Sequence, residues 1–196
     1  MRCAGTAPAW ASASAPDVAV FVVLLRGINL GSKRRVAMAD LRSLLEGLGY
    51  DDVRTHLQSG NAVFRTPTRS AATVEKTVAR AITSDLGLEV DVIARTAQQM
   101  AAVVDADPFT GVATEPARYL VTFLEKKPPA SWLDSVDTES YAPEQAAVVG
   151  KQLYLWLPKG VHDSKLARKL TDKKLGGSAT SRNWNVVTKL AEMAAE

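Results

Sequence analysis

The sequence has few of the residues on which disulfide, metal and nucleophilic chemistry depend. Its single cysteine, Cys3, excludes an internal disulfide and a zinc site built from several cysteines. Two histidines, His56 and His162, leave little material for a metal cluster or a catalytic triad. The longest apolar run, Val18 to Leu25, is too short to cross a bilayer. We therefore expect no metal, no cofactor and no membrane association.

The overall composition is that of a folded globular protein. Of 196 residues, 46% are hydrophobic and 23% are charged. Residues 1–16 are rich in Ala, Ser and Pro and lack the apolar segment of a signal peptide. We interpret them as a disordered N-terminal extension or the product of a start codon assigned too early, and we expect a cytoplasmic protein.

The net charge of +3 is unevenly distributed along the chain. Residues 1–95 carry 12 basic and 9 acidic side chains, residues 96–149 carry 3 and 8, and residues 150–196 carry 9 and 4. This asymmetry favours an anionic partner, but a solvated basic surface facing the acidic middle segment would explain it equally well. The predicted basic surface consists of Lys33, Arg34, Arg35, Lys165, Arg168 and Lys169.

Residues 17–95 show the pattern of a ferredoxin-like half, with the order β-α-β-β-α-β. The strands are predicted from apolar or alternating residues and the helices from apolar stripes with caps at Ser70 and Gly87. The predicted elements are a central strand at Val18–Leu25, a helix around Leu41–Leu48, a hairpin of Val53–Gln58 and Ala62–Thr66, a helix from Ser70 to Gly87, and a strand at Val90–Arg95.

Residues 96–196 repeat this order less regularly, and we interpret them as a second, degenerate ferredoxin-like half with C-terminal helices. The last strand is expected to be lost or very short near Ala179. The other predicted elements are helices at Thr96–Val104, Ser131–Val136, Ser164–Leu175 and Trp184–Met193, and strands at Tyr119–Leu124, Gln145–Val149 and Gln152–Leu157. The predicted fold class is α+β, with antiparallel sheets in two tandem halves.

Two loops of the first half are expected to meet. Because crossover connections require the first two strands to run in the same direction, Arg26–Gly31 and Gln58–Asn61 lie at one end of the sheet. Their side chains are mostly hydrogen-bond donors, which suit an anion or a nucleotide edge. Alternatively, the glycines only supply tight turns and Arg26 only bridges the loops. The candidate ligand-binding residues here are Arg26, Asn29, Gln58, Ser59 and Asn61.

A second polar cluster, Arg182-Asn183-Trp184-Asn185, is expected to open the last helix. The free N–H groups of a helix start can hold a phosphate or carboxylate, and Trp184 could stack on a base or ring. In the alternative interpretation, Ser181 or Asn183 merely caps the helix and Trp184 packs in the core. All four residues are candidates for ligand binding.

The sequence offers no evident catalytic machinery. His162 stands beside an acid and a hydroxyl, but neighbours in sequence do not make a triad. Asp40 or Asp163 could act as a general base only if the fold brings one of them to the loops. We therefore assign no catalytic residue and leave open whether the protein is an enzyme.

Five segments together resemble a known family. They are LLRGINLG, VAMADLRSLLEGLGY, VRTHLQSGNAVF, LYLWLPKG and SRNWNVVTKL. In this order they resemble the bacterial domain of unknown function 1697 family, from about Val20 to the C-terminus. The resemblance implies an α+β fold with tandem ferredoxin-like halves. It implies no activity.

We weigh three classes of function. The favoured one is a module that binds an anionic ligand, either a phosphate-containing small molecule or nucleic acid, where the Arg26–Gly31, Gln58–Asn61 and Arg182–Asn185 segments meet. The alternative is a structural or regulatory protein-interaction module, with a homodimer left open. An enzyme acting on a phosphorylated or carboxylated substrate has less support.

Overall fold

The first half of the chain folds as one antiparallel sheet with two helices. A computed structural model describes residues 18–31, 34–129, 131–170 and 177–196, so the predictions for residues 1–16, for Lys33 and for the end of the Ser164–Leu175 helix lie outside the described part. The elements are β1 (Ala19–Leu25), α1 (Met38–Gly47), β2 (Asp51–His56), β3 (Asn61–Thr66), α2 (Ala71–Leu86) and β4 (Val92–Thr96).

The second half forms another sheet of the same size. Its elements are α3 (Ala97–Asp105), β5 (Tyr119–Leu124), α4 (Ser131–Asp134), β6 (Gln145–Val149), β7 (Gln152–Trp156), α5 (Lys165–Lys169), β8 (Ala179–Asn183) and α6 (Trp184–Ala195). Single 3-10 turns at Pro116–Arg118 and Glu139–Tyr141 precede β5 and β6. Both sheets are followed by helices, as the α+β prediction requires.

The two sheets have the same topology. The first has the order β2-β3-β1-β4 and the second β6-β7-β5-β8, and all neighbouring strands are antiparallel. The expectation that the last strand is lost or very short near Ala179 is wrong: β8 is five residues long and pairs with β5 along its whole length. The second half is therefore complete in its strands.

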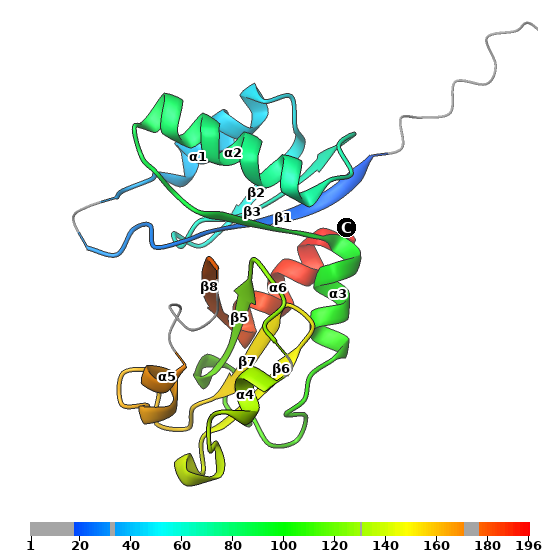
Figure 1. Ribbon diagram of the computed structural model, residues 1–196. Helices are drawn as coiled ribbons and strands as arrows, with labels where there is room; N and C mark the ends of the chain where they lie inside the picture. Colours follow the sequence, from blue (N-terminus) through cyan, green and yellow to red (C-terminus); the bar gives the residue numbers. More distant parts are fainter. Residues whose placement is uncertain (1–17, 32–33, 130, 171–176) are drawn as a thin grey trace, which may run out of the picture.

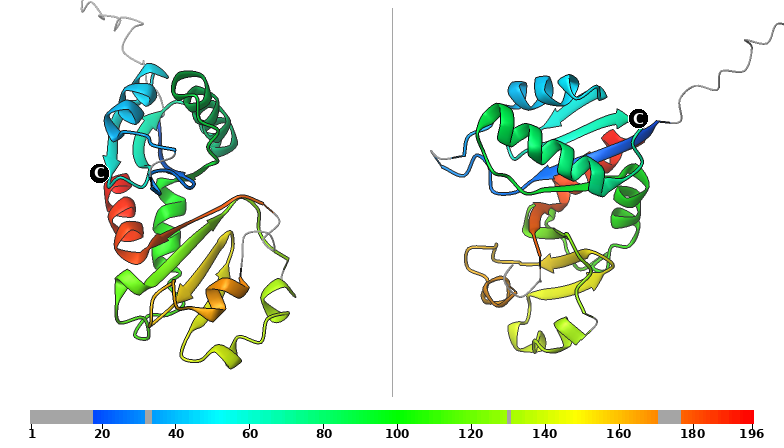
Figure 2. Two further views of the ribbon diagram at one scale, coloured as in Figure 1. Left: turned by 90° about the vertical axis from the view of Figure 1, so that its left-hand side faces the viewer. Right: turned by 45° about the horizontal axis from the view of Figure 1, so that its top comes forward.

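The molecule is built in layers (Figure 1). Helices α1 and α2 cover one face of the first sheet, and α3 and α6 lie side by side between the two sheets (Figure 2). The far face of the second sheet packs on residues around α4 and α5. The core between the sheets joins the two halves.

Strand β1 is apolar throughout because both of its faces are covered. Phe21, Val23 and Leu25 pack with α1 and α2, whereas Val22 and Leu24 point to the layer of α3 and α6. All five side chains are fully buried. A strand covered on one face only would alternate with polar residues.

Local capping signals behave as predicted at helix α2. The Ser70 hydroxyl accepts a hydrogen bond from the Thr73 N–H, and Gly87 ends the helix in the left-handed conformation. At the other end of the chain, the C-terminal turn of α6 is held against the first sheet. Arg54 on β2 donates to the Met193 carbonyl at 2.7 Å, which places a cation beside the negative end of the helix dipole.

Candidate functional site

The loop after β1 and the β2–β3 turn lie together, as the strand directions predict. The Leu25 N–H donates to the Gly60 carbonyl at 2.8 Å. The amide of Asn29 donates to the Gln58 carbonyl at 2.6 Å and to the Val36 carbonyl at 2.9 Å, while its oxygen accepts from the Val36 N–H. The side chain of Asn29 therefore holds the two loops in place.

Arg182 carries the contact between these loops and the second half. It lies on β8 opposite Val121, so its side chain shares the face of the second sheet that looks toward the first half. The prediction that it belongs to the start of the last helix is therefore wrong. Its exposed fraction is 8%, and burial lowers the pKa of Arg182 to about 10, which leaves the guanidinium charged at neutral pH.

All five N–H groups of Arg182 have acceptors. Nε donates to Asn61 Oδ1 at 2.5 Å. Nη1 donates to Thr180 Oγ1 and the Ser181 carbonyl, each at 2.8 Å, and Nη2 donates to the Leu25 and Ser59 carbonyls, each at 2.9 Å. A guanidinium has five donors, so this network leaves none for a ligand. In this structure Arg182 and Asn61 join the two halves.

Two of the three candidate residues after Arg182 also have structural roles. The Asn183 side chain accepts from the Val186 N–H at 3.1 Å and so caps α6. The Trp184 ring stacks on Tyr119 with the centroids 4.7 Å apart and packs against the core between the sheets. Asn185 is exposed on the first turn of α6. Capping and core packing were the alternative interpretation of this cluster, and the geometry agrees with it.

Arg26 joins the loops to the segment before β4, and to the second half, through Asp91. Its Nη1 lies 3.1 Å from Asp91 Oδ2, and the same oxygen accepts from the Ser178 hydroxyl at 2.8 Å. The hydrogen bond from Ser178, together with the Arg26 guanidinium, holds the pKa of Asp91 below its ordinary value despite some desolvation.

The replacement Asp91→Asn is expected to lower the free energy of unfolding at neutral pH by at most about 1 kcal/mol, since both partners are substantially exposed. The pKa of Asp91 is lower in the folded protein than in the unfolded chain. The carboxylate therefore contributes its full stabilisation above the ordinary pKa of 3.8, and this stabilisation is lost as the pH falls through the pKa of the folded state. Urea unfolding at neutral pH and below pH 3.8 should show the difference between parent and variant shrinking in acid. Asp137→Asn, at an exposed aspartate of the second half, is the control.

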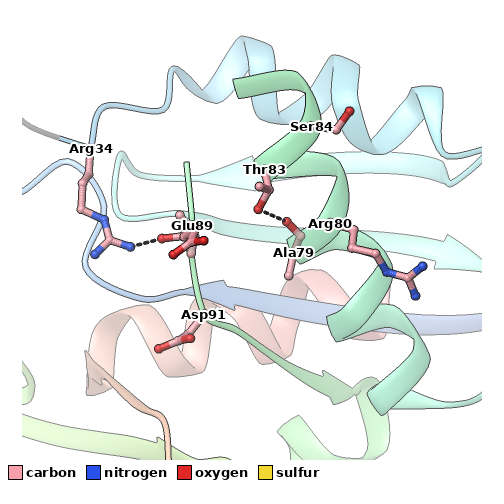
Figure 3. Close-up of a pocket in the computed structure, with 8 residues that line it drawn as sticks. Arg34, Ala79, Arg80, Thr83, Ser84, Glu89 and Asp91 are labelled. Carbon is pink, nitrogen blue, oxygen red and sulfur yellow. Dashed lines mark hydrogen bonds between the residues drawn. The ribbon is translucent and has the colours of Figure 1, made fainter. Parts of the chain in front are cut away.

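Two hollows lie near the predicted loops. The first, which we call the loop pocket, has a volume of about 360 Å³. It is lined by Asn29, Gly31, Arg35, Val36, Ala37 and Gln58. The second has a volume of about 810 Å³ and lies between α2 and the segment before β4 (Figure 3). Its charged residues are of both signs, and its Arg34 donates to the Glu89 carbonyl. Only the loop pocket combines residues of both predicted loops without an acidic side chain among those described.

None of the groups weighed for catalysis is among the described residues that line the loop pocket. His162 and Asp163 are exposed in the segment before α5, and Asp40 is exposed in the first turn of α1. Within the described ranges, no cluster of three or more His, Cys, Asp or Glu side chains could hold a metal ion. In the same part of the chain, no helix is both long and apolar enough to span a membrane.

Comparison with known proteins agrees with the fold. The family described as protein of unknown function (DUF1697) matches residues 18–154. The chain belongs to the DUF1697 family. No curated protein matches its sequence. The solved structure of the conserved bacterial protein SP0830 from Streptococcus pneumoniae has a TM-score of 0.71 at 19% identity, and the match covers 90% of this chain and 99% of that one.

In this DUF1697 chain the described residues of the predicted basic surface are all exposed. They are Arg34, Arg35, Lys165, Arg168 and Lys169. Arg35 lines the loop pocket, whereas Arg168 donates to the His162 carbonyl at 3.0 Å near α5. That these residues bind an anion stays a prediction.

Sequence reasoning missed one buried cation of this DUF1697 chain, Arg95. It lies on β4 two residues after Ile93, so the strand period of two gives both side chains the inward face between the sheets. Its exposed fraction is 5%. A charged residue on the same face as a core isoleucine was the available signal.

Proposed function

We propose that this DUF1697 protein is a module that binds a small anionic ligand in the loop pocket. The observation that carries the proposal is the joining of the two predicted donor-rich loops around one hollow of about 360 Å³, within the range of small-molecule sites. One residue of each loop lines the hollow, Asn29 from the first and Gln58 from the second. Arg35 supplies the positive charge.

The hydrogen bonds around the pocket support a preorganised site. Asn29 sits in the left-handed conformation, at φ 56°, and its side chain fixes both loops. Leu57, beside Gln58, has the same φ, although a bulky residue rarely adopts it. Such backbone strain is concentrated at functional sites. In this proposal Arg26, Ser59, Asn61 and Arg182 hold the loops, and Arg35 with Gln58 meets the ligand.

We also infer that each half is a ferredoxin-like unit, with residues 17–95 forming the first and residues 96–196 the second. The element order and the sheet order support this inference. The ligand class follows from the donors at the loops, and a cytoplasmic location belongs to the same proposal.

A protein-interaction module is the second candidate, because two large apolar side chains flank the pocket in exposed positions. Leu30 is 79% exposed and Leu57 is 57% exposed. Exposed apolar residues on neighbouring loops suit a protein partner, including a second copy of the chain. In this case the oligomeric state, measured by sedimentation, would change in the double variant Leu30→Ser/Leu57→Ser.

A thermal-shift and calorimetric screen tests the anion proposal. The ligands are nucleotides, sugar phosphates, carboxylates and short RNA and DNA. We expect one class to stabilise the parent, and Arg35→Gln to weaken its binding about tenfold because one charge-assisted hydrogen bond is lost. A steep loss of affinity with rising salt would indicate nucleic acid rather than a small molecule.

Arg80→Gln is the matched control for this experiment. Arg80 is exposed on α2, outside the loop pocket, and its replacement removes the same charge. Both variants should melt at the parent's temperature without ligand. If no ligand shifts the parent, or if Arg35→Gln binds as the parent does, the loop pocket is not an anion site.

A further inference from the structure

A separate hollow, which we call the Arg95 pocket, lies between helix α3 and the β6–β7 hairpin, elements that Figure 1 labels. Its volume is about 370 Å³. One wall is a single face of α3, and the other is the hairpin turn with the start of β7. The lining residues are Arg95, Gln99, Ala102, Val103, Ala106, Val149, Gly150, Lys151, Gln152 and Tyr154.

The guanidinium of Arg95 has more N–H donors than the described residues use. Nη1 donates to the Ala94 carbonyl at 2.8 Å, and Nη2 donates to the Leu124 carbonyl at 2.7 Å. Among the described residues these are its hydrogen-bond partners, so three of its five N–H groups remain for something else. Arg182, buried to a similar degree, differs because the fold occupies all five of its donors.

The charge of Arg95 is also poorly compensated. Within the described part of the chain, no carboxylate lies within ion-pair distance of it. The Phe123 ring, with its centroid 5.7 Å from the guanidinium carbon, offers only a cation–π contact. Glu75 exerts a longer-range attraction, while burial lowers the pKa of Arg95. A buried cation in this state is stabilised by any anion that enters.

Two further lining residues reinforce the same preference. Lys151, at the hairpin turn, adds a second positive charge. Its one hydrogen bond to a described residue goes to the Glu125 carbonyl at 3.1 Å. Gln99 accepts from the Thr96 N–H through its side-chain oxygen, which leaves its NH₂ group to donate. None of the described residues that line the Arg95 pocket is acidic.

We propose that the Arg95 pocket binds a small oxyanion, a carboxylate or a phosphate group, attached to a short apolar body. Arg95 retains donors for the oxygens of such a group, and Lys151 lies on the same hollow. Ala102, Val103 and Ala106 give the α3 wall an apolar surface. Among the residues that the structure describes, this site shares none of its lining with the loop pocket, and it does not depend on the function proposed there.

Calorimetric titration of the purified full chain tests this proposal with three probes: butyrate, inorganic phosphate and butylammonium. We expect saturable binding of butyrate or phosphate and none of butylammonium, which has the same apolar body and the opposite charge. Binding of phosphate but not butyrate would identify the phosphate as the group recognised.

The main variant is Gln99→Glu. A glutamate keeps the capping contact to Thr96, so the variant should melt as the parent does, but it places a negative charge in the pocket. We expect it to weaken binding at least tenfold, and Lys151→Gln to weaken it several-fold. Lys126→Gln removes an exposed lysine outside the pocket and should leave the affinity unchanged.

Arg95→Gln should abolish binding, although the loss of its contact to Leu124 can also lower the melting temperature. Gln99→Glu therefore decides the question with the fold intact. The proposal is overturned if neither butyrate nor phosphate binds saturably to the parent, or if Gln99→Glu and Lys151→Gln bind as the parent does. It is also overturned if Arg35→Gln, in the loop pocket, removes the same binding.

Discussion

The replacement Arg182→Met is expected to lower the free energy of unfolding by about 3–5 kcal/mol, the largest effect of any single substitution considered for this protein. Methionine fills much of the space of the arginine stem but donates no hydrogen bond. It leaves without a donor the oxygens that Arg182 joins on Leu25, Ser59 and Asn61 in the first half. Each buried acceptor that loses its donor costs about 1–3 kcal/mol. Water can satisfy some of the five acceptors of Arg182, so the total loss is smaller than the sum.

Urea and thermal unfolding followed by circular dichroism would measure the effect. For a chain of this length the melting temperature should fall by about 10 °C. Arg80→Met, at an exposed position on α2, removes the same charge with the same residue and should change stability by less than about 0.5 kcal/mol. A loss below about 1 kcal/mol for Arg182→Met would mean that the network is not what joins the halves.

Arg182→Lys separates charge from geometry at the same position. Lysine keeps the positive charge but has three donors on one nitrogen instead of five on a planar fork. It cannot reach acceptors on β1, the β2–β3 turn and β8 together. We expect most of the Arg182→Met loss to remain.

Much of the fold could be predicted from periodicity and caps because these signals are local. The apolar run of β1, the Ser70 and Gly87 caps of α2, and the alternating hairpins all report on neighbours a few residues away. The pairing directions then follow from the connections, which is why the loop containing Asn29 and the turn containing Gln58 were correctly expected to meet.

Strand β8 could not be predicted in the same way. Its residues Thr180, Ser181 and Arg182 are polar, and a polar strand carries no apolar alternation. The Arg182 side chain is buried between the two halves, where it donates to acceptors on Asn61 and Leu25. Both acceptors lie more than 100 residues away in the chain. A polar residue satisfied by so distant a partner gives no local sign of its burial.

The same limit applies to the candidate site. Donor-rich loops were recognised by composition, but composition does not show which donors the fold uses. The fold uses all or nearly all of the side-chain hydrogen-bond donors of Asn29 and Arg182. In contrast, Arg35 is exposed at the loop pocket, and Arg95 retains donors at the Arg95 pocket. Counting the donors that remain after folding separates the structural polar residues from those free to bind.

The replacement Gly60→Ala is expected to have the second-largest effect, a loss of about 3 kcal/mol in the free energy of unfolding. Gly60 has a φ of 73°, which disfavours any residue with a Cβ. A Cβ there would also lie 2.7 Å from Ile28 Cδ1 and 2.7 Å from Leu25 Cβ, both in the core under α1 and α2. Real contacts do not come this close, so the turn must move.

Gly27→Ala is the control that isolates the steric part of this loss. Gly27 has a similar φ of 62°, but a Cβ at that position would meet nothing within 4 Å. It should therefore cost only the backbone strain, about 1 kcal/mol. Equal losses for the two alanine variants in urea unfolding would show that Gly60 is needed for its conformation alone.

Movement of the turn at Gly60 should also weaken the network around Arg182. The Gly60 carbonyl accepts from the Leu25 N–H, and the neighbouring Ser59 carbonyl accepts from Arg182. If Gly60→Ala shifts this turn, part of the Arg182 network is already lost before Arg182 is replaced. The double variant Gly60→Ala/Arg182→Met should then be more stable than the sum of the single losses predicts, by about 1 kcal/mol. Strict additivity of the two losses in the free energy of unfolding would mean that the turn and the junction between the halves contribute to stability independently. The position of Gly60 would then not affect the hydrogen bonds of Arg182.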